Sequence, residues 1–259
     1  MEKMFYLLSA MLIMSFQSIQ GQLPDPVRLM DESRDLTMSG NLQATVTLTI
    51  TEKNGAVRTR KVNMISKTYG GTEKRLMKFL EPADVRGTAM LIIDNKDDQD
   101  DMWIYLPALK RTRRIVSTEK GKSFMSSEFT NADMASGRNA DFNISHMPGS
   151  GQNGQWIIES VPVDDDVADE YGFSRKVTYL DKADLKIRKI DFYNFDGDLF
   201  KTIEILGTQP KPGGQKGYIM TEMYAVNHLN GRSSRVKFDN INTSASIPDN
   251  TFIADNLSR

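Results

Sequence analysis

The residue types that most often carry catalysis are scarce in this sequence of 259 residues. It has no cysteine, which excludes disulfides, thiolate zinc sites, iron–sulfur clusters and cysteine nucleophiles together. Its two histidines, His146 and His228, are expected to be ordinary surface or loop residues. No Gly-x-Ser-x-Gly elbow and no phosphate-binding glycine loop occurs. We predict a protein that is not an enzyme and has no cofactor or metal, although an Asp/Glu pair for glycoside hydrolysis stays open.

Two acidic runs raise the question of a calcium site. The first, residues 94–101, lacks the mid-loop glycine of an EF-hand, and its twelfth position is Tyr105 instead of glutamate. We therefore interpret it as a solvated hairpin loop between two apolar strands. The same interpretation applies to the second run, residues 164–166.

The most concentrated basic run is Lys110-Arg111-Thr112-Arg113-Arg114. If it is a strand, alternation sends Arg111 and Arg113 to one face and Arg114 to the other. An inward arginine needs a carboxylate, a carbonyl or a ligand acceptor. We therefore predict Arg111, Arg113 and Arg114 as contacts for a polar head group or a partner, with Arg111 or Arg113 inward. The alternative is a set of solvated charges that keep an edge strand from pairing.

The overall charge argues against nucleic acid as a partner. Lys and Arg number 33 and Asp and Glu 34, for a net charge of −1. Such a chain has no global field to hold a polyanion. With 39% hydrophobic and 26% charged residues, it belongs among folded globular proteins.

The amino terminus has the pattern of a signal peptide. Lys3 precedes an apolar run at residues 4–16, which is too short to span a bilayer. Gly21 offers a small residue at the cleavage edge, and a lipoprotein signal would need a cysteine there. We predict a signal peptide at residues 1–21, a single domain at 22–259 and export to a bacterial periplasm. A buried amphipathic helix is the alternative.

The rest of the chain alternates with the period of β-strands. In residues 42–51, apolar side chains alternate strictly with polar ones, and Asn54-Gly55 then marks a hairpin turn. The pattern predicts a mainly β fold: one strongly curved antiparallel sheet of about eleven strands. Helices at residues 25–38 and near 130–136 are expected against its concave face, with mobile loops elsewhere in residues 121–154. The expected strands cover residues 42–51, 57–67, 73–80, 87–94, 102–106, 111–117, 155–163, 174–180, 185–195, 199–207, 218–227 and 233–240.

Two of these strands are apolar on both faces. Residues 89–93 and 102–106 consist almost entirely of aliphatic and aromatic side chains. A strand covered on both sides explains the pattern, and a helix over the concave face would supply one cover. The chain also has 15 methionines, which suit a surface for varied apolar ligands or, equally, plain core packing.

Three segments, taken in order, resemble one known family. They are residues 79–91 (FLEPADVRGTAML), 103–115 (WIYLPALKRTRRI) and 123–134 (SFMSSEFTNADM), and residues 247–252 (IPDNTF) also fit. Together they resemble the outer membrane lipoprotein-sorting proteins, relatives of the periplasmic carrier LolA and of the treponemal LolA-like proteins. The resemblance spans nearly all of residues 22–259. Ser126 departs from the pattern, since the family often has glycine there.

The resemblance implies an unclosed β-barrel whose apolar cavity holds acyl chains of lipoproteins or of another lipid. Such a carrier would be a monomer that moves its cargo from an inner-membrane transporter to an outer-membrane acceptor. The alternative is an envelope scaffold, or an accessory of an efflux-type transporter, that binds protein. Alternation does not fix which strand face is inside. The candidate cavity residues are Met90, Ile92, Trp103, Tyr105, Phe124, Met125 and Phe129.

Overall fold

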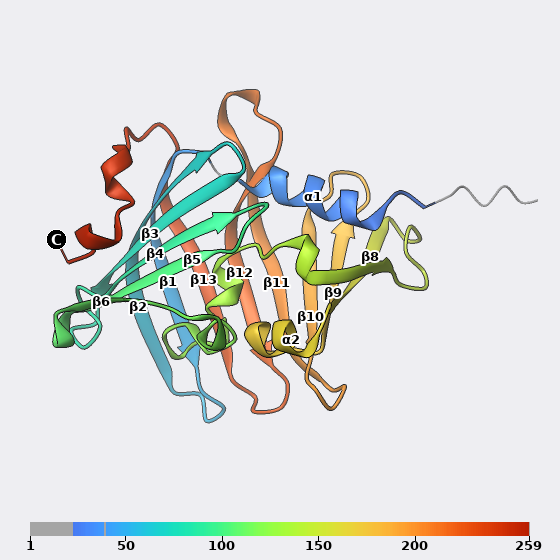
Figure 1. Cartoon of the computed structure of the whole chain (residues 1–259), viewed down its shortest axis with the longest axis horizontal. Coiled ribbons are helices and arrows are strands. Elements are labelled where there is room, and N and C mark those ends of the chain that lie inside the picture. The colour runs from blue at the N-terminus through green and yellow to red at the C-terminus, as the bar shows by residue number, and fades with distance from the viewer. Residues whose placement is uncertain (1–22, 39, 259) are drawn as a thin grey trace, which may run out of the picture.

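One antiparallel sheet organises the protein (Figure 1). The computed structural model describes residues 23–38 and 40–258, so the predicted signal peptide lies outside the described residues. The helices are α1 (Pro26–Thr37) and α2 (Asp165–Tyr171). The strands are β1 (Leu42–Thr51), β2 (Val57–Tyr69), β3 (Thr72–Glu81), β4 (Ala89–Asn95), β5 (Asp101–Leu106), β6 (Arg111–Arg114), β7 (Phe142–His146), β8 (Gln155–Pro162), β9 (Arg175–Asp181), β10 (Ile187–Tyr193), β11 (Leu199–Pro210), β12 (Tyr218–Asn227) and β13 (Ser233–Asn242).

The strand order makes the sheet an open one. It runs β6-β5-β4-β3-β2-β1-β13-β12-β11-β10-β9-β8-β7, with every neighbouring pair antiparallel. The first and last strands of the described chain therefore pair at the centre, while β6 and β7 form the two edges. The prediction of a mainly β, unclosed antiparallel sheet is confirmed, with thirteen strands in place of about eleven.

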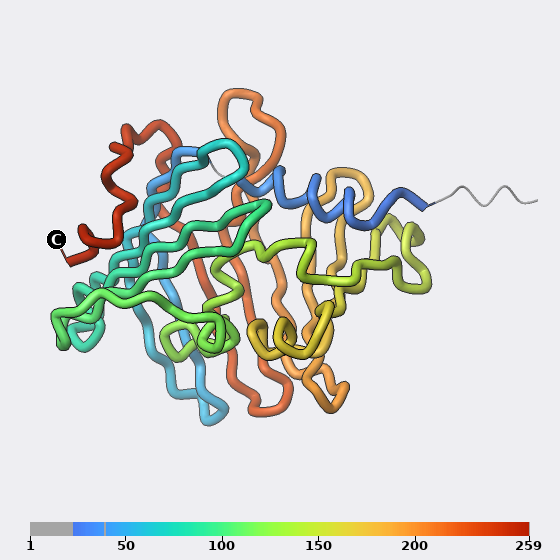
Figure 2. Tube along the Cα trace, in the orientation of Figure 1, coloured from blue at the N-terminus to red at the C-terminus, as the bar shows by residue number. Residues whose placement is uncertain are grey.

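The connection from β6 to β7 must cross the whole sheet, because these strands lie at opposite edges. Residues 115–141, here called the crossing segment, pass over the same face as α1 (Figures 1 and 2). The helix expected near residues 130–136 is a single 3-10 turn, Ala132–Met134. Its predicted cap is present: the Asp133 N–H donates to Thr130 Oγ1 (3.2 Å), and the Thr130 N–H donates to Asp133 Oδ2 (2.7 Å).

The α1 helix begins where the sequence predicts. Asp25 caps it by accepting a hydrogen bond from the Val27 N–H (3.0 Å), and Pro26 occupies the first helical position. No helix of the described residues is long and apolar enough to cross a membrane.

The acidic run at residues 164–166 is not a loop, contrary to our prediction. The Asp164 carboxylate caps α2 by accepting from the Val167 N–H (2.9 Å), and the next two aspartates lie in its first turn. Negative charge at a helix N-terminus is favoured by the helix dipole. The helix ends at Gly172, whose positive φ of 76° forms the cap.

The sheet has an apolar cluster on each face, which explains why residues 89–93 and 102–106 are apolar on both sides. In the register of β4 and β5, Met90 opposes Ile104 on the inner face, and Leu91 opposes Trp103 on the outer face. The inner cluster lies under α1 and the crossing segment. The outer cover is the carboxyl-terminal segment, residues 245–257, which adds Ile247, Phe252 and Leu257. This cover was not predicted.

We expect Ser126→Gly to stabilise the protein by about 0.5–1 kcal/mol. Ser126 has a left-handed φ of 63°, and this conformation costs a residue with a side chain more free energy than it costs glycine. Ser127→Gly is the matched control at an extended neighbour. It should destabilise by about 1–2 kcal/mol, since the Ser127 hydroxyl donates to the Phe124 carbonyl (2.7 Å). Denaturant unfolding measures both. A loss of stability in Ser126→Gly would contradict this account of the loop.

Candidate functional site

A cavity of about 300 Å³ lies between the inner face of the sheet, α1 and the crossing segment. Its volume falls at the lower end of the range for ligand pockets, about 300–1,000 Å³. Strand alternation supplies the lining: Leu42, Val46 and Leu48 come from one face of β1. Other apolar lining side chains are Val62, Met64, Met77, Ile190, Phe192, Ile203, Ile205, Ile219, Met220, Met223, Val236 and Phe238.

Buried charges tie the cover of the cavity to the sheet. Arg34 of α1 pairs with Asp94 of β4 (2.6 Å), and both side chains are less than a tenth exposed. Asp94 also accepts from the Ser136 N–H and hydroxyl of the crossing segment (2.9 Å each). Burial raises the pKa of Asp94, while Arg34 and Arg75 act in the opposite direction. The prediction of a solvated loop at residues 94–101 therefore fails at both Asp94 and Asp100, because both are buried.

Two further side chains hold the crossing segment over the cavity. Arg75 on β3 donates to the Met134 carbonyl (2.6 Å), and Lys201 on β11 pairs with Asp133 (2.7 Å). Both cations lie at inner-face positions of their strands, on the same face as apolar residues such as Met77 and Ile203. A charged residue on the apolar parity of a strand is the signal that would have found them in the sequence.

One cationic side chain of the lining has no such partner. Lys176 on β9 lines the cavity, and no carboxylate of the described residues lies within ion-pair distance of its ammonium. Its Nζ lies 4.6 Å from the centre of the Phe142 ring. Burial lowers the pKa of Lys176 to about 8, despite the opposing charge of Asp133. Two residues along the strand, the buried Thr178 hydroxyl also lacks a hydrogen-bond partner among the described residues.

The seven candidate cavity residues divide among three positions. Phe124 and Phe129 of the crossing segment line the cavity. Met90 and Ile92 are fully buried in the inner cluster, and Met125 packs against it, but none of the three lines the cavity. Trp103 and Tyr105 lie in the outer cluster, on the far side of the sheet. Contact with a ligand stays a prediction for all seven residues. The geometry favours such contact at Phe124 and Phe129, which line the cavity.

The three candidate arginines lie on the edge strand β6 and are exposed. Arg113 pairs with Glu119 (2.6 Å), and Arg114 pairs with Asp101. None of them lines the cavity, whose arginines are Arg34 and Arg75. The placement fits the alternative interpretation of solvated edge charges, and a role in contacting a partner stays a prediction.

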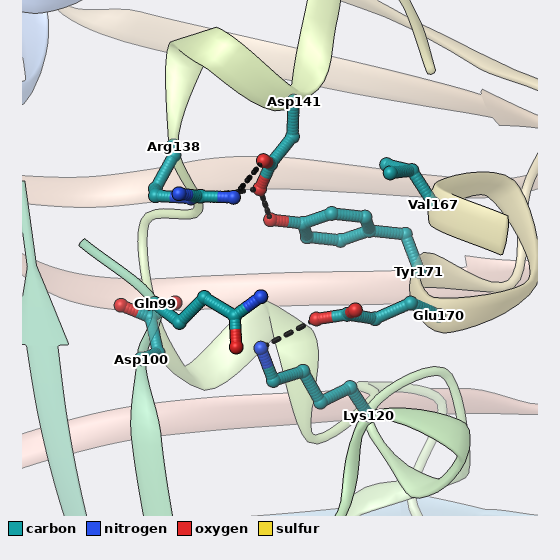
Figure 3. Close-up of a pocket in the computed structure, with 8 residues that line it drawn as sticks. All are labelled: Gln99, Asp100, Lys120, Arg138, Asp141, Val167, Glu170 and Tyr171. Atoms are coloured by element: carbon teal, nitrogen blue, oxygen red, sulfur yellow. Dashed lines mark hydrogen bonds and ion pairs between the residues drawn. The ribbon is translucent and has the colours of Figure 1, made fainter. Parts of the chain in front are cut away.

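A second, polar pocket of about 40 Å³ lies where α2 meets the crossing segment (Figure 3). Lys120 and Glu170 form an ion pair (2.5 Å), and the Tyr171 hydroxyl donates to Asp141 (2.8 Å). Arg138 completes the group by pairing with Asp141. The space suits no more than a few water molecules. These bonds fasten α2 to the crossing segment.

The histidines make local hydrogen bonds. The His146 Nδ1 lies 2.7 Å from the Ser150 hydroxyl, and its Nε2 lies 2.7 Å from the Pro24 carbonyl. His228 Nε2 lies 2.8 Å from the Thr202 hydroxyl. Across residues 23–38 and 40–258, no group of three or more His, Asp or Glu side chains could hold a metal ion.

Known structures share this fold. An outer membrane lipoprotein-sorting protein domain from Vibrio parahaemolyticus is 28% identical, with a TM-score of 0.80, over 90% of this chain and 98% of its own. A DUF1329 family protein from Desulfovibrio piger is 25% identical, with a TM-score of 0.76, over 90% and 99%. A LolA superfamily protein from Nitrosomonas europaea, 17% identical with a TM-score of 0.67 over 89% and 98%, shares the fold.

The chain thus shares the fold of a lipoprotein-sorting protein domain and of a LolA superfamily protein, the proteins that its sequence resembles. A family model described as "-like: Uncharacterized protein" matches residues 71–259, and the chain belongs to that family. No curated protein sequence matches the chain.

The buried Asp100 gives a pH-dependent prediction. Burial, with the negative charge of Asp94, raises the pKa of Asp100 to about 7. A raised carboxyl pKa means that the folded state binds the proton more tightly, so its ionisation costs stability as pH rises through that value. We expect Asp100→Asn to be about 1–3 kcal/mol more stabilising at pH 8 than at pH 5.

Denaturant unfolding of both proteins at the two pH values measures this difference. Asp97→Asn, at an exposed position of the same loop, is the control and should show no such dependence. An equal effect of Asp100→Asn at both pH values would show that Asp100 is ionised throughout.

Proposed function

We propose that the protein is a carrier that binds acyl chains of lipoproteins or other lipids in the cavity. One observation carries the proposal: a cavity lined by aliphatic, aromatic and methionine side chains lies beneath α1 and the crossing segment, and ion pairs fasten both of them to the sheet. Methionine is flexible and polarizable, which suits varied apolar ligands. Each methylene that enters such a cavity contributes about 0.8 kcal/mol before the costs of binding.

The structural relatives support the same class. The Vibrio parahaemolyticus protein is described as a lipoprotein-sorting domain, and its fold covers nearly all of this chain. Sorting requires a site that shields acyl chains from water during transfer, and the inner face of the sheet offers one. In this proposal the carrier is non-enzymatic and acts as a monomer.

We propose the location of the carrier from the amino-terminal sequence and its partners from the family resemblance. The apolar run at residues 4–16 and Gly21 favour a signal peptide at residues 1–21 and a mature domain at 22–259 in the periplasm. Such a carrier would take cargo from an inner-membrane transporter and pass it to an outer-membrane acceptor. An envelope scaffold that binds protein through the edge strand β6 is the second candidate, favoured by its exposed arginines.

Binding of a fluorescent fatty-acyl probe tests the proposal. The wild type should bind the probe saturably, and Ile205→Asp should weaken binding at least about tenfold, because it puts a carboxylate into the apolar lining. Leu206→Asp is the matched control, since Leu206 follows on the same strand, is 46% exposed and does not line the cavity. Equal binding by both variants would contradict the site. Absence of binding by the wild type would favour the scaffold.

A further inference from the structure

The apolar cavity has a polar end on β9. Lys176 and Thr178 are two residues apart on one strand, so their side chains project from the same face about 7 Å apart. Both line the cavity. The pair therefore places an ammonium and a buried hydroxyl at the boundary of the space between the sheet and its cover.

The other charged side chains of the lining are neutralised within the protein. Arg34 pairs with Asp94, and Arg75 with Glu73. Asp133 pairs with Lys201 (2.7 Å). Lys176 differs, because among the described residues it has aromatic rings but no carboxylate as an immediate neighbour.

The unmatched charge carries a cost that the fold alone does not explain. Removing an ammonium from water without a counter-ion destabilises the folded state. The pKa of Lys176, about 8, reflects that cost, yet leaves roughly nine-tenths of the side chain protonated at pH 7. Thr178 is 1% exposed, and its buried hydroxyl also lacks a hydrogen-bond partner among the described residues. Two adjacent polar groups without partners, in one apolar cavity, indicate a ligand group that satisfies both.

We infer that the cavity takes a single-chain anionic amphiphile, whose acyl chain lies among the apolar residues and whose carboxylate or phosphate accepts hydrogen bonds from Lys176 and Thr178. The inference rests on the proposed function and narrows its cargo. An anionic oxygen group supplies the missing counter-charge to the ammonium and an acceptor for the hydroxyl. A neutral acyl group would leave the ammonium uncompensated. The volume of about 300 Å³ suits one chain better than several.

Competition among three ligands with the same 12-carbon chain tests the inference. Laurate, dodecyl phosphate and 1-dodecanol each displace a neutral fluorescent probe from the cavity, below their micelle concentrations. The wild type should bind at least one anion about 10- to 100-fold more tightly than the alcohol, the range expected for a hydrogen bond to a charged group. Tighter binding of laurate would indicate a free fatty acid as the source, and tighter binding of dodecyl phosphate a phospholipid-type head group.

Lys176→Met should remove this preference and keep the affinity for dodecanol, while Lys176→Arg should restore the preference. Lys61→Met is the control, because it removes the same charge from an exposed side chain of β2. Its ligand preference should match the wild type. Thermal unfolding monitors folding, and Lys176→Met should be at least as stable as the wild type.

If Lys176→Met binds none of the ligands, Thr178→Val tests the anion preference instead, because it removes only the hydroxyl from a side chain of equal shape. It should weaken anion binding about 3- to 10-fold and leave dodecanol binding unchanged. Equal affinity of the wild type for anions and alcohol, or a preference that survives in Lys176→Met, would overturn the inference and leave the carrier function intact. Absence of binding of all three ligands by the wild type would overturn the carrier function as well.

Discussion

The structure depends on a topological constraint: the chain leaves the sheet at one edge, β6, and must re-enter at the opposite edge, β7. The shortest route lies over the concave face, so residues 115–141 become the cover of that face (Figure 2). A covering segment with so little regular structure must satisfy its buried polar groups through side chains. Arg75, Ser234 and Asp94 do so, by bonding to Met134, Glu128 and Ser136 respectively.

This constraint separates the inner face into a packed part and an open part. Toward β4 and β5, residues such as Met90 and Ile92 are buried in the inner cluster and do not line the cavity. Toward β11 and β12, residues such as Ile205 and Met223 line the cavity beneath the crossing segment, which the Lys201–Asp133 ion pair fastens to β11.

The strands could be predicted from the sequence because their period of two is a local property. Alternation of Leu42, Ala44 and Val46 with polar residues suffices to identify β1, and no long-range contact is needed. The β7 strand was missed because its five residues follow a long irregular stretch, and α2 because its aspartates suggested a loop instead of a cap. Thus short elements, whose stability comes from tertiary contacts, escaped the sequence pattern.

The cavity could be predicted only in part, because a binding site depends on strand register and on the parity of each strand. Phe124 and Phe129 were found through the family resemblance, and both line the cavity. Trp103 was chosen through the same resemblance, but its pairing with Leu91 places it on the outer face. Lys176 carries no local signal, since both faces of β9 mix polar and apolar residues and the strand does not alternate between the two kinds.

The central claim is that the cavity holds an acyl chain, and native mass spectrometry of the protein purified from its own periplasm without detergent tests it most directly. The account predicts a complex of one chain with one acyl-bearing molecule, which tandem dissociation releases as a lipid. Ile205→Asp, purified in the same way, should have the mass of the polypeptide alone. A wild-type protein that is free of lipid, or that carries only a protein partner, would contradict the account.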